Sequence, residues 1–168
     1  MSIKLDLKIF LFLFLFLLTS QIEMYIILMI FAIIHELGHL IAGLILKFKP
    51  EEIKLSPVGL QISFKVEPEE YNTKVKKANP INIKKAILAL AGPLTNLLIS
   101  TILILIGKFN LNLQSNYIYQ IIIYSNFLIA MFNLIPIYPM DGGRFLNELL
   151  KIFVGNKKAY KITYITSK

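Results

Sequence analysis

The stretch 24–46 has the sequence MYIILMIFAIIHELGHLIAGLIL. It is long enough to cross a bilayer as a helix, which takes about 20 consecutive apolar residues. Three ionisable side chains nevertheless lie at its middle, namely His35, Glu36 and His39. Ionisable groups inside a membrane helix are energetically costly and usually mark a functional site. The stretch therefore predicts both a membrane-spanning helix and the position of the functional site along it.

The composition of the whole chain agrees with a membrane protein. Of its 168 residues 56% are hydrophobic, and the mean hydropathy is +0.66. Three further apolar runs are present, so we predict an all-α membrane protein with about four transmembrane helices. The predicted spans are about 8–22, 24–46, 86–106 and 117–138. A signal peptide is the alternative for the first run, but no small-residue cleavage site follows it.

A polar segment, 47–85, separates the second and third predicted spans. Apolar and polar residues alternate over 60–66, which is the period of a half-buried strand. The turn-forming residues 57–59, with the sequence PVG, precede them. We therefore predict a small β-hairpin between the second and third helices. The charged residues 67–79 show no such pattern and predict a surface loop.

Positive charge is distributed unevenly around the four predicted spans. The N-terminal segment, the 47–85 segment and the C-terminal segment lie on one side of the membrane. Of the 18 Lys and Arg residues, only Lys108 lies on the other side. Because cytoplasmic segments are enriched in Lys and Arg, we predict a multi-pass protein with both termini in the cytoplasm. This arrangement accounts for the net charge of +8 without nucleic acid, for which the sequence holds no binding motif.

Residues 35–39, HELGH, form the pattern H-E-x-x-H. Residues four apart share one face of a helix, so His35 and His39 can bind the same zinc ion. Glu36 is then placed to take a proton from water activated by that ion. A buried polar network between helices and the ion path of a transporter are the alternatives. A transporter, however, is expected to carry acidic or His residues in several spans, and the chain has only these two His.

A catalytic zinc ion takes a third protein ligand and leaves its fourth position to water. The chain has no cysteine and no further histidine, so this ligand must be acidic. Glu23 lies about three turns from His35 along the same helix, too far to share the ion. Asp141 follows the last predicted span within PMDGGR, where prolines end the helix and glycines let the chain turn back. Asp141 is therefore the predicted third ligand, and an ordinary Asp-Gly turn is the alternative.

Three motifs, in this order, resemble the site-2 protease family of intramembrane zinc metalloproteases. They are HELGH at 35–39, AGPLTN at 91–96 and FNLIPIYPMDGGR at 132–144. The resemblance extends to the bacterial sporulation branch of the family, the stage IV sporulation protein FB type. It implies an endopeptidase that uses zinc-activated water to cleave a membrane-tethered or transmembrane protein, such as a pro-sigma factor in sporulation. Without the resemblance, AGPLTN predicts only a kinked helix that packs closely on its neighbours.

The resemblance also implies a role for each candidate site residue, with Zn²⁺ as the cofactor. The implied zinc ligands are His35, His39 and Asp141, the general base is Glu36, and the substrate-binding residues are Asn133, Pro139 and Asn96. The implied partners are the membrane-tethered substrate and the lipid bilayer of a bacterial cell membrane. The alternatives are an inactive or truncated homologue that acts as a binding protein and, from another class, a metal-ion transporter.

We predict one metalloprotease domain over 1–155 and a basic tail over 156–168. Residues 144–153 predict an amphipathic helix that ends at Gly155. The sporulation branch usually continues with further spans and a nucleotide-sensing CBS domain, whereas this sequence stops at Lys168. A truncated gene, a fragment and a minimal core are the alternatives, and under the first two the tail is the start of a truncated C-terminal region. ATP sensing is not carried over to this chain.

Overall fold

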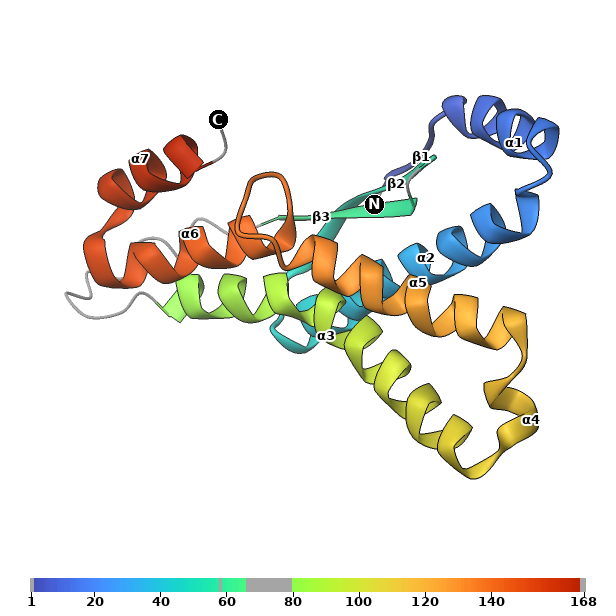
Figure 1. Cartoon of the computed structure of the whole chain (residues 1–168). Helices are drawn as coiled ribbons and strands as arrows, with labels where there is room; N and C mark the ends of the chain where they lie inside the picture. Colours follow the sequence, from blue (N-terminus) through green and yellow to red (C-terminus); the bar gives the residue numbers. More distant parts are fainter. Residues whose placement is uncertain (1, 58, 66–79, 167–168) are drawn as a thin grey trace.

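The computed structural model describes residues 2–57, 59–65 and 80–166, and Figure 1 shows how its helices and strands are arranged. Most of these residues are helical, and a small sheet lies beside the helices. The elements in chain order are β1 (Ser2–Leu5), α1 (Lys8–Leu18), α2 (Ile22–Ile45), β2 (Lys49–Ser56), β3 (Gly59–Lys65), α3 (Pro80–Phe109), α4 (Leu111–Gln114), α5 (Tyr117–Asn133), α6 (Asp141–Val154) and α7 (Asn156–Thr166). The loop predicted at 67–79 lies outside the described residues.

The two longest helices, α2 and α3, pack against each other and against α5. With 24 and 30 residues, α2 and α3 are long and apolar enough to cross a membrane. Helices α1 and α5 are also apolar but have only 11 and 17 residues. Two helices in the described part of the chain thus have spanning length, and the predicted count of four spans is not confirmed.

The helix ends differ from the predicted spans in three places. The predicted first span, 8–22, is interrupted between α1 and α2 by a turn in which Ser20 has a φ of 57°. Helix α3 begins at Pro80 rather than at 86, because proline suits the first turn of a helix. Helix α5 ends at Asn133 rather than at 138, because Pro136 disfavours helical backbone before it and cannot continue the helix.

The helices expose large apolar side chains and bury small or polar ones. Phe10, Ile41, Leu98 and Leu128, on α1, α2, α3 and α5, are each about 60% exposed. Among the side chains buried on α3 and α5 are Asn96, Ser100, Ser125, Asn126 and Ala130. Soluble proteins show the reverse, whereas membrane helices meet apolar lipid outside and pack through small and polar groups. This distribution supports the prediction of a membrane protein.

The predicted hairpin is present as β2 and β3, which pair antiparallel with Ile53 opposite Ile62. The alternation predicted for β3 is confirmed, because Leu60, Ile62 and Phe64 are half-buried and the polar residues between them are exposed. The strand packs onto α2, where Gly43 leaves room for the ring of Phe64. This packing holds the hairpin close to the part of α2 that carries the two histidines.

The sheet also has a third strand that the sequence analysis did not predict. Strand β1 pairs in parallel with β2, so the strand order is β1-β2-β3 and β3 lies at one edge. With four residues, β1 is too short to show a periodic pattern of its own. Its pairing depends on a strand that lies beyond two intervening helices in the sequence, and local patterns do not reveal such contacts.

The amphipathic helix predicted at 144–153 is present as α6, and Gly155, with a φ of 83°, follows its last residue. The helix begins earlier than predicted, at Asp141. The two glycines after Asp141 were expected to let the chain turn back, but they lie inside the first turn of α6. A Cβ on the first of them would overlap the carbonyl of Leu134, so they allow close approach of the preceding loop. The predicted tail contains α7, which packs on α6.

Candidate metal centre

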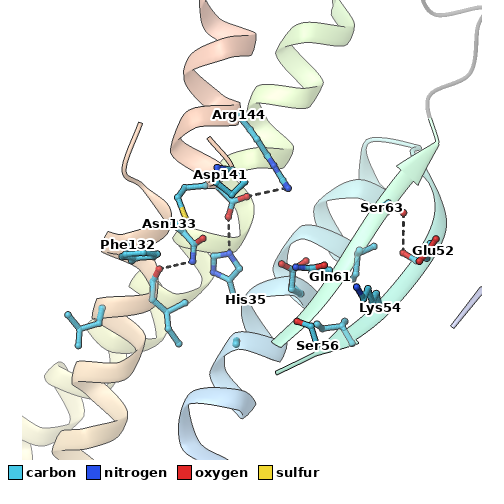
Figure 2. A pocket seen from close by; sticks show the side chains of 18 residues that line it. His35, Glu52, Lys54, Ser56, Gln61, Ser63, Phe132, Asn133, Asp141 and Arg144 are labelled. Carbon is cyan, nitrogen blue, oxygen red and sulfur yellow. Dashed lines mark hydrogen bonds and ion pairs between the residues drawn. The ribbon is translucent and has the colours of Figure 1, made fainter. Parts of the chain in front are cut away.

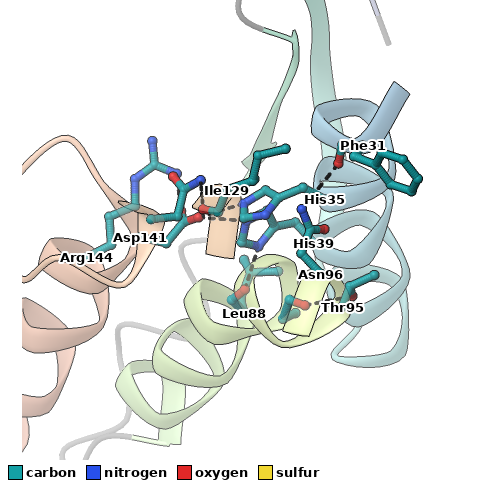
Figure 3. Close-up of polar contacts among 11 residues, drawn as sticks. Phe31, His35, His39, Leu88, Thr95, Asn96, Ile129, Asp141 and Arg144 are labelled. Atoms are coloured by element: carbon teal, nitrogen blue, oxygen red, sulfur yellow. Dashed lines mark hydrogen bonds and ion pairs between the residues drawn. The ribbon is translucent and has the colours of Figure 1, made fainter. Parts of the chain in front are cut away.

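His35 and His39 lie one turn apart on the same face of α2, and Asp141 lies opposite them in the first turn of α6 (Figure 3). Nε2 of His35 is 3.0 Å from Oδ2 of Asp141, and Nε2 of His39 is 3.1 Å from the same oxygen. The two Nε2 atoms are 3.2 Å apart, and all three residues are buried. The three residues predicted as zinc ligands thus place their donor atoms at the corners of a small triangle.

The carboxyl group of Asp141 is held as an anion. It lies at the N-terminus of α6, where the helix dipole favours negative charge. Burial by itself raises the pKa of this carboxyl group, but contact with the two imidazole rings outweighs burial and lowers the pKa below its ordinary value. Nη1 of Arg144 lies 3.5 Å from Oδ1, the other carboxylate oxygen. In the sequence Arg144 stands out only as a motif position, so this contact was not predicted.

Hydrogen bonding around His39 indicates that the triangle suits a metal ion. Nδ1 of His39 lies 2.8 Å from the carbonyl oxygen of Leu88, which can only accept, so Nδ1 carries a proton. In the neutral ring Nε2 then carries a lone pair and can only accept a hydrogen bond. It faces the carboxylate of Asp141, which is also an acceptor. A proton on Nε2 would resolve this by charging the buried His39 ring, whereas one cation satisfies all three atoms. Ligand atoms about 2.0–2.1 Å from a tetrahedral zinc ion lie roughly 3.3 Å apart, close to the observed distances.

Gly92 on α3 leaves room for such an ion. A Cβ at this position would overlap Nε2 of His39 and would lie 2.6 Å from Nε2 of His35. A methyl group would therefore compete with the ion for the space beside the ligand atoms. Gly92 was predicted only as a small residue for close helix packing. Its place beside the metal centre was not predicted, because glycine has no side chain that could identify it as part of a metal site.

A cavity of about 960 Å³ opens beside the triangle (Figure 2). Strands β2 and β3 form one wall, α5 forms the opposite wall, and His35 and Asp141 lie between them. Glu36 is half-buried and lines both this cavity and a second one, of about 370 Å³, beside α3 and α6. Its carboxyl group thus borders the space in which a peptide bond and a water molecule can meet the three ligand residues.

The residues predicted to bind substrate lie in two different places. Asn133, at the end of α5, and Pro139, just before α6, both line the larger cavity. Nδ2 of Asn133 donates to the carbonyl oxygen of Ile129 at 2.9 Å. Asn96 lines neither of these cavities, because it is fully buried and donates from Nδ2 to the carbonyl oxygen of Phe31 at 3.4 Å. Asn133 and Pro139 thus border the larger cavity, whereas Asn96 lies away from both cavities.

Comparison with known proteins gives a consistent set of relatives. The chain matches the sequence model of peptidase family M50 over residues 23–115 and 109–168. It is 29% identical over 140 residues to a zinc metalloprotease of Methanocaldococcus jannaschii. The aligned region covers 83% of this chain and 38% of that protein. It is 26% identical over 150 residues to stage IV sporulation protein FB of Bacillus subtilis, covering 89% of this chain and 48% of that protein. The chain thus spans less than half the length of each of these two relatives.

The fold is also similar to a solved structure. The site-2 protease from Methanocaldococcus jannaschii superposes with a TM-score of 0.67 at 28% sequence identity. The superposition covers 96% of this chain and 72% of that chain. The similarity therefore includes nearly all of the elements described above.

Proposed function

The chain belongs to peptidase family M50, the site-2 protease family, and from this premise we propose that it is an intramembrane zinc metalloendopeptidase. The observation that carries the proposal is the convergence of His35, His39 and Asp141, two of which line the same cavity as Glu36. The exposed apolar surfaces of α2, α3 and α5 support placement in a bilayer. The proposed substrate is a membrane-tethered or transmembrane protein, with a sporulation pro-sigma factor as the specific candidate.

The residues present can supply each function that hydrolysis of a peptide bond needs. A bound zinc ion would lower the pKa of water and polarise the scissile carbonyl group. His35, His39 and Asp141 would hold that ion. Glu36 would take a proton from the attacking water and deliver it to the leaving nitrogen. Asn133 and Pro139 line the cavity where the substrate backbone would lie.

We further propose that the substrate binds as an extended strand along the free edge of β3. A helical substrate must unwind before its carbonyl groups can be attacked, and strand pairing stabilises an unwound segment. Pro50 on β2 stands opposite Phe64 on β3. Because proline has no N–H, these two residues do not form a hydrogen-bonded pair, and the N–H of Phe64 points away from β2. Because N–H directions alternate along a strand, Ile62 and Phe64 direct theirs to the free edge. A hairpin that only rests on the membrane surface is the alternative.

We expect Ile62→Pro to slow cleavage by up to about tenfold, because one net hydrogen bond contributes roughly 0.5–1.5 kcal/mol. Ile62→Ala keeps the N–H and is expected to cleave at close to the wild-type rate. Both variants should retain their zinc, since Ile62 contributes no ligand. Cleavage would be followed with a short membrane-tethered peptide in detergent. Wild-type cleavage by Ile62→Pro would exclude strand pairing and favour the surface hairpin.

The proposal also covers the organisation of the chain. Residues 1–155 would form the protease domain in a bacterial cell membrane, with both termini in the cytoplasm. An inactive homologue that binds membrane proteins and a metal-ion transporter are the competing functions. In the described part of the chain, one group of His and acidic residues could hold a metal ion. A transport path is expected to need several such groups, so this observation favours the protease.

The test of the function compares the wild type with Asp141→Asn after purification in detergent. We expect the wild type to hold about one zinc ion per chain and to cleave the tethered peptide. Asp141→Asn should lose both, because an amide is a weaker ligand than a carboxylate. A variant that kept zinc and activity would point to a metallopeptidase of another type. Zinc in the wild type without cleavage would favour the inactive homologue, and a wild type without zinc would refute the proposal.

A further inference from the structure

The two histidines of the metal centre differ in how their second ring nitrogen is satisfied. Nδ1 of His39 donates to the carbonyl oxygen of Leu88. Nδ1 of His35 is buried and has no hydrogen-bond partner among the described residues. A metal-binding histidine almost always donates its other ring N–H to an acceptor, which fixes the ring orientation and strengthens the ligand. If Nε2 of His35 binds the ion, Nδ1 must carry a proton, and this proton needs an acceptor.

Asn96 offers an acceptor of the required kind. Its Oδ1 is likewise buried and without a partner in the part of the chain that the structure describes. Its Nδ2 donates to the carbonyl oxygen of Phe31, which lies one helical turn before His35. Carbonyl groups in a helix point towards the C-terminal end, so the Asn96 amide lies against the turn of α2 that leads to His35 (Figure 3).

The packing of α3 on α2 places the two residues on facing segments of these helices. Gly92 lies one turn before Asn96 on α3, and a Cβ there would lie 2.8 Å from Cδ2 of His35. The α3 segment from Gly92 to Asn96 therefore runs along the α2 segment from His35 to Phe31. Asn96 is fully buried and His35 is 4% exposed, so neither orphan atom can be satisfied by bulk solvent.

We infer that Asn96 is a positioning residue of the metal centre, whose Oδ1 accepts a hydrogen bond from Nδ1–H of His35. The bond forms in the metal-loaded protein, directly or through one buried water molecule. It satisfies two buried polar atoms at once, each of which is otherwise costly. It also fixes the tautomer of His35 with Nε2 free to bind the ion. Asn96 then contacts neither substrate nor metal, in agreement with its absence from both cavities.

The test measures zinc affinity by competition with a chelator, and ligand geometry from the visible spectrum after Co²⁺ substitution. Asn96→Leu removes the acceptor and is expected to weaken zinc binding about 10- to 100-fold and to change the Co²⁺ spectrum. Asn96→Asp keeps an acceptor oxygen but not the donor to Phe31, and it should retain close to wild-type affinity. The thermal stability of the metal-free proteins shows whether each variant folds.

Asn126 on α5 provides a matched control, because it is also fully buried and its Oδ1 also lacks a partner among the described residues. Asn126→Leu should bind zinc like the wild type. Three results would overturn the inference: wild-type affinity in Asn96→Leu, equal weakening in Asn96→Asp and Asn96→Leu, or equal weakening in Asn126→Leu. The inference rests on the proposed metal centre. A wild type that bound no metal would refute that centre itself, whereas full affinity in Asn96→Leu would refute only the role of Asn96.

Discussion

Glu36→Gln will keep its zinc and lose cleavage. The Glu36 side chain is not a corner of the ligand triangle, so its loss leaves the three proposed ligands in place. Glutamine has nearly the same shape but cannot accept the proton of the attacking water. A general base contributes about 10²- to 10⁴-fold to the rate, and we expect a loss in this range. The measurement pairs the rate of cleavage of a membrane-tethered peptide with the zinc content of the same preparation.

The matched control for this prediction is Glu52→Gln. Glu52 lines the same cavity from β2 and pairs with Lys4, away from the ligand triangle. Its conversion to glutamine should leave both zinc content and cleavage rate close to the wild type. Full activity in Glu36→Gln would show that another group takes the proton. A loss of zinc in Glu36→Gln would show that Glu36 acts as a ligand and not as a base.

Gly92→Ala is expected to weaken zinc binding while leaving the fold intact. The added methyl group would overlap Nε2 of His39 and crowd Nε2 of His35. Overpacking typically costs about 1–3 kcal/mol, which corresponds to roughly 5- to 150-fold in zinc affinity. Alanine is also the better helix former by about 1 kcal/mol, so the metal-free protein should not be destabilised through α3 itself. Zinc content, zinc affinity and thermal stability of the metal-free protein together check this expectation.

Gly107→Ala is the control on the same helix. A Cβ at Gly107 would come no closer than 3.2 Å to the ring of Tyr119, far from the ligand residues. This variant should bind zinc with wild-type affinity. If Gly92→Ala also bound zinc normally, α3 would have to move away from α2 to admit the methyl group. The narrow space beside the histidines would then be able to widen without loss of zinc binding.

The metal ligands could be predicted because each one leaves a trace in the sequence. His35 and His39 are spaced by one helical turn, and local helical geometry is enough to place them together. Asp141 was found by elimination, because a membrane segment contains few acids. The structure brings these three side chains together, but zinc binding itself stays a prediction. The hairpin was predictable for the same local reason, since Leu60 and Ile62 show the period of a strand.

Other features depend on contacts that no local pattern encodes. Strand β1 exists because Ile3 and its neighbours pair with β2 across two intervening helices. Helix α5 ends before Pro136, although the apolar run continues to residue 138. The hydropathy of this run therefore does not reveal where the helix ends. Gly92 and Asn96 were visible as motif positions, but the place of Gly92 beside His35 and the contact of Asn96 with Phe31 follow from the packing of α3 on α2. Sequence patterns therefore located the candidate ligands, whereas the residues that pack around them could be found only from the three-dimensional arrangement.

The inverted burial of the helices has a consequence for how this protein tolerates genetic drift. Bulky aliphatic residues such as Ile41 and Leu98 face outward, where one oily side chain can replace another at little cost. Gly38 is different, because a Cβ there would overlap Oγ1 of Thr95 on the neighbouring helix. Exchange of one outward-facing apolar residue for another is thus expected to cost little, whereas any larger residue at Gly38 would push α2 and α3 apart.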